Sequence, residues 1–188
     1  MAYTYDQLVA ALNDAAYRYA IDPNIAYRQI DQESRFNPNA VSPAGAQGIA
    51  QFMPDTARRF GLANPFDPIA SFDAWGRYMR LMLDMFGGRY DLALASYNSG
   101  ENRAEYRNAA REGRAINWSV LPGRVQSETR NYVVAILGSD APVTESVSTI
   151  ETPLNGYATV DQTGSEDSGI PTWALLAFGV VAIVLIAR

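Results

Sequence analysis

The sequence predicts an all-α domain over residues 1–138, made of about seven to nine short helices. Apolar residues recur at steps of three and four, which is the period of one helix face. Glycine and proline residues of the kind that begin or end helices separate these segments. No run of alternating apolar and polar residues, typical of a strand, stands out.

The first expected helix has one apolar face, formed by Tyr5, Leu8, Val9, Leu12, Ala16 and Tyr19. Asp22 and Pro23 then match an N-cap followed by proline at the first helical position. They predict a second helix that continues to about Ser34. Two short helices are expected at 46–52 and 54–60, and Gly61 ends the second of them.

A longer helix follows, with helical spacing of Phe72, Trp75, Met79, Met82, Leu83 and Phe86. Gly87 and Gly88 are expected to end it, and Asp91 to cap a further helix through Tyr97. A more polar helix is predicted over 100–111. The last is predicted over 126–137, with one side formed by Thr129, Tyr132, Val133 and Ile136.

The chain changes character after residue 138. Residues 139–169 carry six acidic residues and no basic residue, and their Ser, Thr and Gly content predicts a flexible linker. Residues 170–187, IPTWALLAFGVVAIVLIA, carry no charge, and as a helix they would span roughly 27 Å, close to the hydrocarbon thickness of a bilayer. With Trp173 and Arg188 suited to its two ends, segment 170–188 predicts a transmembrane helix; the alternative is a buried core helix.

The composition narrows the possible chemistry. The chain has no Cys and no His, and all fifteen of its basic residues are Arg. A serine nucleophile would lack a His or Lys to activate it, and thiolate or imidazole metal sites are excluded. Proton transfers would therefore depend on Asp, Glu or Tyr. Residues 1–138 hold fourteen acidic residues and fourteen arginines, so nucleic acid is not an expected partner.

One carboxylate lies in an unusual setting, within QESRFNPNAVSPAGAQGIAQFMPDTA (32–57). Glu33 lies in the last turn of a predicted helix and precedes a loop rich in Asn, Pro, Ser and Gly. The negative helix end and apolar neighbours such as Phe36 and Ile49 should raise the pKa of its carboxyl. A raised pKa suits a general acid near neutrality. The alternative is an ordinary surface glutamate beside an irregular loop.

The same stretch resembles the signature of lytic transglycosylases of the Slt type, which share a lysozyme-like fold with goose-type lysozymes. From Glu33 it reads E-S-x-F-N-P-x-A-V-S-x-x-G-A-x-G-x-x-Q-x-M-P-x-T-A. Two blocks follow in order: ALASYNSGENRA (93–104) is similar to A-Y-N-A-G, and ETRNYV (128–133) to E-T-x-x-Y-V. The departures are Ser96 and Ser99 in place of alanines, and Ala50 where Met is common.

The resemblance implies that Glu33 is the catalytic acid/base, without a cofactor or metal. Positions implied to line the glycan groove are Ser42, Gln51, Met53, Tyr97 and Asn98. Gly45 and Gly48 fall where the family's backbone turns beneath the sugar. Tyr97 is expected to bond near Glu33 or the substrate's acetamido group, unless it is simply packed. Glu128 and Tyr132 match the last motif, as sugar contacts or as structural residues.

The implied substrate is the peptidoglycan strand, cut between N-acetylmuramic acid and N-acetylglucosamine. Glu33 would protonate the leaving oxygen and then accept the proton of the C6 hydroxyl, which closes a 1,6-anhydro ring. A goose-type hydrolase remains an alternative, as does a non-catalytic, membrane-tethered wall-binding protein of a virion.

Localisation is a separate question, since the opening MAYTYDQLVA shows no secretory signal. An anchor at 170–187 would then leave the domain in the cytoplasm, while Arg188 weakly favours a cytoplasmic C-terminus. A bacteriophage with an internal membrane taken from its host reconciles these observations. We therefore expect a single-pass protein of a virion membrane, with capsid or other virion membrane proteins as partners. The bacterial inner membrane is the alternative.

Overall fold

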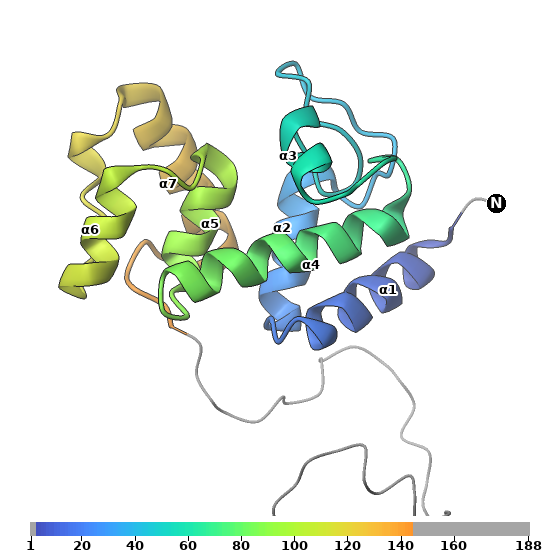
Figure 1. The fold of residues 1–188 in the computed structure, drawn as a ribbon, viewed down its shortest axis with the longest axis horizontal. Helices are drawn as coiled ribbons and strands as arrows, with labels where there is room; N and C mark the ends of the chain where they lie inside the picture. The colour runs from blue at the N-terminus through green and yellow to red at the C-terminus, as the bar shows by residue number, and fades with distance from the viewer. Residues whose placement is uncertain (1–2, 145–188) are drawn as a thin grey trace, which may run out of the picture. The chain divides into compact units, whose positions relative to one another are not determined.

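Residues 3–144 are described in the computed structural model, and within that range the protein forms seven α-helices and one 3-10 helix (Figure 1). They are α1 (Tyr5–Arg18), α2 (Pro23–Ser34), α3 (Pro54–Arg59), α4 (Pro68–Met85), α5 (Tyr90–Ser99), α6 (Ala104–Glu112), η1 (Trp118–Val120) and α7 (Gly123–Leu137). Within this range the β-type backbone pairings are isolated bridges rather than strands of a sheet. The all-α prediction is therefore confirmed.

The prediction of a helix over 46–52 is wrong. Gln47 instead forms antiparallel bridges with Val41 and with Phe52, so the segment is a folded-back loop. Gly48 has φ +75° and Gln51 has φ +50°, both in the left-handed region. A right-handed helix cannot run through two such residues. The apolar spacing reflects burial of Ile49, Ala50 and Phe52 in the core rather than a helix face.

Three other helix starts differ from the expected ones. The helix predicted over 100–111 is α6, which begins at Ala104. Arg89 rather than Asp91 is the N-cap of α5. Asp91 lies in the first turn, fully buried, and accepts hydrogen bonds of 2.7 and 2.6 Å from the Arg89 guanidinium. Pairing of two buried charges outweighs capping at this position, since an unpaired buried carboxylate is costly. α7 begins at Gly123, before the expected 126, without a capping side chain to mark its start.

The longest helix, α4, packs against α1 on one side and against α5 on the other, as Figure 1 shows. Trp75 and Met79 of α4 are completely buried, together with Leu12 of α1 and Leu92 of α5. α7 packs against both α5 and α2. The contact between α2 and α7 matters most for the site, because it joins segments about a hundred residues apart.

The described range ends inside the predicted linker. The Tyr90 backbone N–H donates to the Val143 carbonyl at 2.7 Å, so the chain is held to the domain up to this point. No helix within residues 3–144 combines the length and apolar character that crossing a bilayer requires. The rest of linker 139–169 and the predicted transmembrane helix 170–188 lie outside the described residues.

Asp67→Ala is expected to lower the free energy of unfolding by about 1 kcal/mol, the usual value of an N-cap. The Asp67 carboxylate caps α4 by accepting from the backbone N–H groups of Ile69 (3.0 Å) and Ala70 (3.2 Å). Urea unfolding followed by circular dichroism measures the change. Asp67→Asn is the matched control, because its amide oxygen can still cap the helix. An equal loss in both variants would contradict the capping role.

Candidate active site

Glu33 lies at the end of α2, where the backbone leaves the helix abruptly. Arg35 (φ +53°) and Phe36 (φ +59°) are both left-handed, which ends the helix at Ser34 with Arg35 as its C-cap. The Ser34 hydroxyl donates to the Ile49 carbonyl at 2.7 Å. This bond ties the following loop to the helix end and fixes the surroundings of the Glu33 side chain.

Tyr132 of α7 donates a hydrogen bond to Oε1 of Glu33 at 2.5 Å. The Glu33 residue is partly exposed, but the packing around its carboxyl group desolvates it and raises its pKa from the ordinary 4.5 to about 7. The hydrogen bond from Tyr132 acts in the opposite direction, because it favours the ionised form. The carboxyl can thus hold a proton at neutral pH and can also release it.

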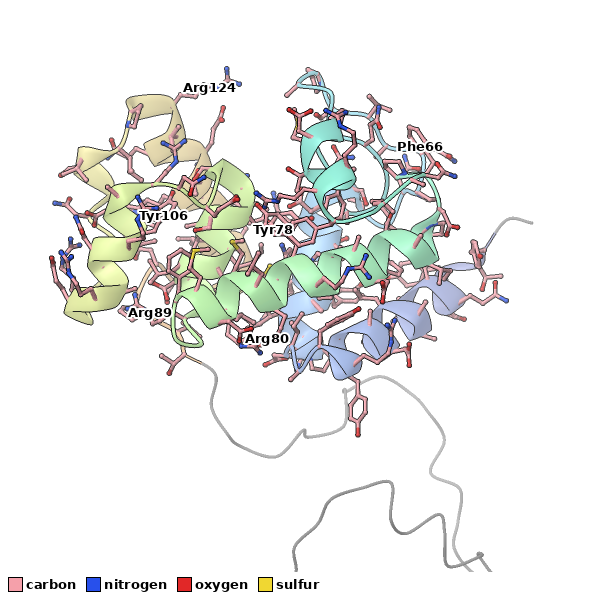
Figure 2. All side chains as sticks on the ribbon, viewed as in Figure 1. Phe66, Tyr78, Arg80, Arg89, Tyr106 and Arg124 are labelled. Carbon is pink, nitrogen blue, oxygen red and sulfur yellow. The ribbon has the colours of Figure 1, made fainter. Side chains whose placement is uncertain are left out.

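Tyr97 of α5 lies within electrostatic reach of Glu33 but forms its hydrogen bond with another residue. Burial raises the pKa of Tyr97, and the charge of Glu33 raises it further. The Tyr97 hydroxyl donates to the Ala50 carbonyl at 2.7 Å, so it bonds to the loop rather than to Glu33, and a contact with the substrate's acetamido group stays a prediction. Its ring lies 5.1 Å from that of Tyr78, which rises from α4 between α5 and α3 in Figure 2.

The loop between α2 and α3 uses two of the predicted groove residues for its own structure. The Ser42 hydroxyl accepts from the Ala46 backbone N–H at 3.0 Å. The Gln51 side chain donates to the carbonyl oxygens of Gly48 (2.8 Å) and Ala40 (3.3 Å). Both residues therefore shape the loop that borders the acid, whether or not they also contact a sugar.

The remaining predicted residues differ in their relation to Glu33. Asn98 is exposed and accepts a hydrogen bond from the Thr129 hydroxyl at 2.8 Å, which links α5 to α7. Met53 is 44% exposed at the start of α3. Glu128 is exposed and pairs at 2.8 Å with Arg124, which extends into solvent at the start of α7 in Figure 2.

Sequence reasoning missed one buried polar residue beside the acid. Gln29 lies one turn before Glu33 on α2 and accepts a hydrogen bond from the Trp75 indole at 3.1 Å. Its spacing of four residues from Glu33 places both on one helix face, which was the available signal. Within residues 3–144, no group of three or more acidic side chains is arranged to hold a metal ion.

Comparison with known proteins decides the family. The family profile described as Transglycosylase SLT domain matches residues 10–119, which is more than half of the 188 residues. The chain belongs to the transglycosylase SLT domain family. The SLT match includes Glu33 and Tyr97, and it ends before Tyr132.

Relatives of this SLT chain include phage and bacterial proteins. It is 26% identical over 165 residues to a Transglycosylase of Enterobacteria phage PRD1, covering 88% of this chain and 57% of that protein. It is 39% identical over 114 residues to Membrane-bound lytic murein transglycosylase D of Escherichia coli, covering 56% of this chain and 25% of that protein. The chain therefore spans little more than half of the phage relative and about a quarter of the bacterial one.

Solved structures of SLT proteins share the fold. An inactive mutant of lytic transglycosylase Slt from Pseudomonas aeruginosa is 28% identical, with a TM-score of 0.55 over 70% of this chain and 23% of its own. The 70 kDa soluble lytic transglycosylase of Escherichia coli is 27% identical, with a TM-score of 0.52 over 68% of this chain and 23% of its own. The predicted resemblance to the Slt type is confirmed for the helical domain.

Proposed function

We propose that this chain is a peptidoglycan lytic transglycosylase in which Glu33 is the only acid/base. The observation that carries the proposal is the Glu33 carboxyl, desolvated to a pKa of about 7 and bonded by Tyr132, at the position that the resemblance to the Slt motif implies for the acid. The printed names of the bacterial relatives, lytic murein transglycosylases, support the same activity and substrate.

In the proposed reaction, protonated Glu33 donates its proton to the glycosidic oxygen between N-acetylmuramic acid and N-acetylglucosamine. The C1–O bond of the muramoyl sugar breaks, and its 2-acetamido group stabilises the positive charge that develops at C1. The hydrogen bond from Tyr132 stabilises the Glu33 carboxylate formed in this step. Glu33 then accepts the C6 hydroxyl proton of the same sugar while O6 bonds to C1. The products are a 1,6-anhydromuramoyl end and a free 4-hydroxyl, with Glu33 protonated again.

A single acid is consistent with the electrostatics of the site. Burial and the Tyr132 hydrogen bond account for the pKa of Glu33, and no second carboxylate in residues 3–144 contributes to it. A carboxylate close enough to act as a base or nucleophile would raise that pKa further. Glu101 is held by Arg59 and by Tyr78, and these partners lower its pKa and keep it ionised.

Mass spectrometry of digested sacculi tests the reaction. We expect muropeptides ending in 1,6-anhydromuramic acid, lighter by one water than the reducing ends that a hydrolase leaves. Glu33→Gln is the control digestion. Reducing ends would overturn the transglycosylase and favour the goose-type hydrolase. Binding to sacculi without release of fragments would favour the non-catalytic wall-binding protein.

We further propose that the protein acts during phage entry, anchored through 170–187 in a virion membrane. The phage relative, matched over 88% of this chain, and the printed word membrane-bound in a bacterial relative's name support this setting. Protease protection on purified particles and on host membranes tests it. Release of the full-length protein from membranes by high salt would contradict the anchor.

A further inference from the structure

Gln29 is a fully buried polar residue whose amide orientation is determined by one neighbour. The indole N–H of Trp75 donates to Gln29 Oε1 at 3.1 Å. An indole nitrogen can only donate, so the amide oxygen of Gln29 must face Trp75. The assignment of oxygen and nitrogen in this side chain is therefore fixed by its chemistry, and the amide nitrogen points away from Trp75.

The amide nitrogen of Gln29 belongs to the α2 face that also carries Glu33, the partner of the Tyr132 hydroxyl. This nitrogen acts to lower the pKa of Tyr132, although burial and Glu33 raise this pKa overall. Among the described residues it has no partner in ordinary hydrogen-bond geometry. A buried N–H group left without a partner is costly, and the phenolic oxygen offers an acceptor. Because Gln29 is completely buried, a substrate cannot reach it.

We propose that Gln29 is a positioning residue that directs the hydroxyl proton of Tyr132 onto Glu33. A phenol has one proton, and when its oxygen accepts from Gln29 this proton is free to point at the carboxylate. Trp75, Gln29, Tyr132 and Glu33 then form a relay in which each donor is oriented by the one before it. The inference rests on the proposed role of Glu33 as acid/base.

The charged and titratable surroundings of Glu33 are simple, which makes the relay testable. Tyr132 faces it from α7 and Tyr97 from α5, while Tyr78 of α4 acts on Tyr97. Burial raises the pKa of all three tyrosines, so each stays neutral through the titration of Glu33. A change in the pKa of Glu33 therefore reports on hydrogen bonding rather than on a neighbouring charge.

Gln29→Met keeps the side-chain length and removes the amide. NMR titration of a ¹³C-labelled Glu33 carboxyl is expected to give a pKa above about 7, because Tyr132 no longer stabilises the carboxylate consistently. The alkaline limb of kcat/KM on sacculi should move to higher pH, and kcat should fall about five- to tenfold, the usual effect of one hydrogen bond. In a Tyr132→Phe background, Gln29→Met should cause no further pKa change.

Each outcome decides the proposal. An unchanged pKa in Gln29→Met, or an equal shift with Tyr132→Phe present, would overturn it. Ile30→Val is the matched control, since it changes a buried apolar residue of α2 and should lower Tm without moving the pKa. Should Gln29→Met not fold, Trp75→Phe frees the amide to turn and must also raise the pKa. The NMR readout needs no enzymatic activity, so its failure is distinct from failure of the proposed function.

Discussion

Glu33→Gln is expected to reduce the rate of sacculus solubilisation by about two to four orders of magnitude, the usual contribution of a positioned proton donor. Glutamine matches the shape of glutamate and can still accept the hydrogen bond from Tyr132. It has no proton to give to the glycosidic oxygen, and it cannot accept one from the C6 hydroxyl. The fall in turbidity of a sacculus suspension measures the rate.

The same variant should be more stable than the parent at alkaline pH. The pKa of Glu33 is about 7 in the folded state against 4.5 ordinarily, so the folded state binds more protons between these values. Stability of the parent therefore falls as pH rises through this window, by about 3 kcal/mol in total. Glutamine does not titrate, so urea unfolding should show the gain at pH 8 and lose it below pH 4.

The control for both measurements is Glu112→Gln, which changes an exposed glutamate of α6 paired with Arg114. It should keep full activity and show no comparable gain in stability at pH 8. Full activity of Glu33→Gln would remove the acid from the mechanism. Lower stability of that variant at pH 8 would mean that folding does not raise the pKa of the Glu33 carboxyl.

Capping residues and apolar spacing in the sequence were sufficient to predict most of the helices. Asp22 and Pro23 predicted the start of α2, and both of its ends agree with the structure. The loop from Ala46 to Phe52 was mistaken for a helix because its apolar spacing matches one. Gly48 could be read as permissive, but nothing in the sequence shows that Gln51 also adopts a positive φ. That conformation depends on its side-chain bonds to Gly48 and Ala40.

The site was predictable as far as its motifs reach. The raised pKa of Glu33 was expected from a helix end beside apolar residues, and the structure gives the same direction through burial. Its role as the acid came from the resemblance and stays a prediction. Its partner could not be chosen in advance, because the hydrogen bond to Tyr132 spans 99 residues of sequence and depends on how α7 packs on α2. The bond between Trp75 and Gln29 spans 46 residues of sequence and likewise depends on tertiary packing.

Gly48→Ala is expected to lower the free energy of unfolding by about 2–5 kcal/mol, combining left-handed strain with overpacking. A methyl group at this position would lie 2.7 Å from the carbonyl carbon of Pro65 and closer still to its oxygen. Backbone atoms cannot rotate away as a side chain can, so the loop itself must move. Urea unfolding monitored by circular dichroism measures the loss.

Gly45→Ala separates the left-handed strain from the overpacking. Gly45 also has a left-handed backbone, φ +89°, but a methyl group there meets no atom within 4 Å. It should cost only about 1–2 kcal/mol, the strain of one left-handed residue. Gly48 also donates to the Ala40 carbonyl at 2.9 Å, so displacing it disturbs the loop that Ser34 ties to the end of α2. Gly48→Ala should therefore slow sacculus solubilisation even at temperatures where the protein stays folded. Gly45→Ala does not displace this loop, so it should not slow solubilisation in this way. Equal losses of the solubilisation rate in the two variants would show that the close approach of Gly48 to Pro65 does not support the acid.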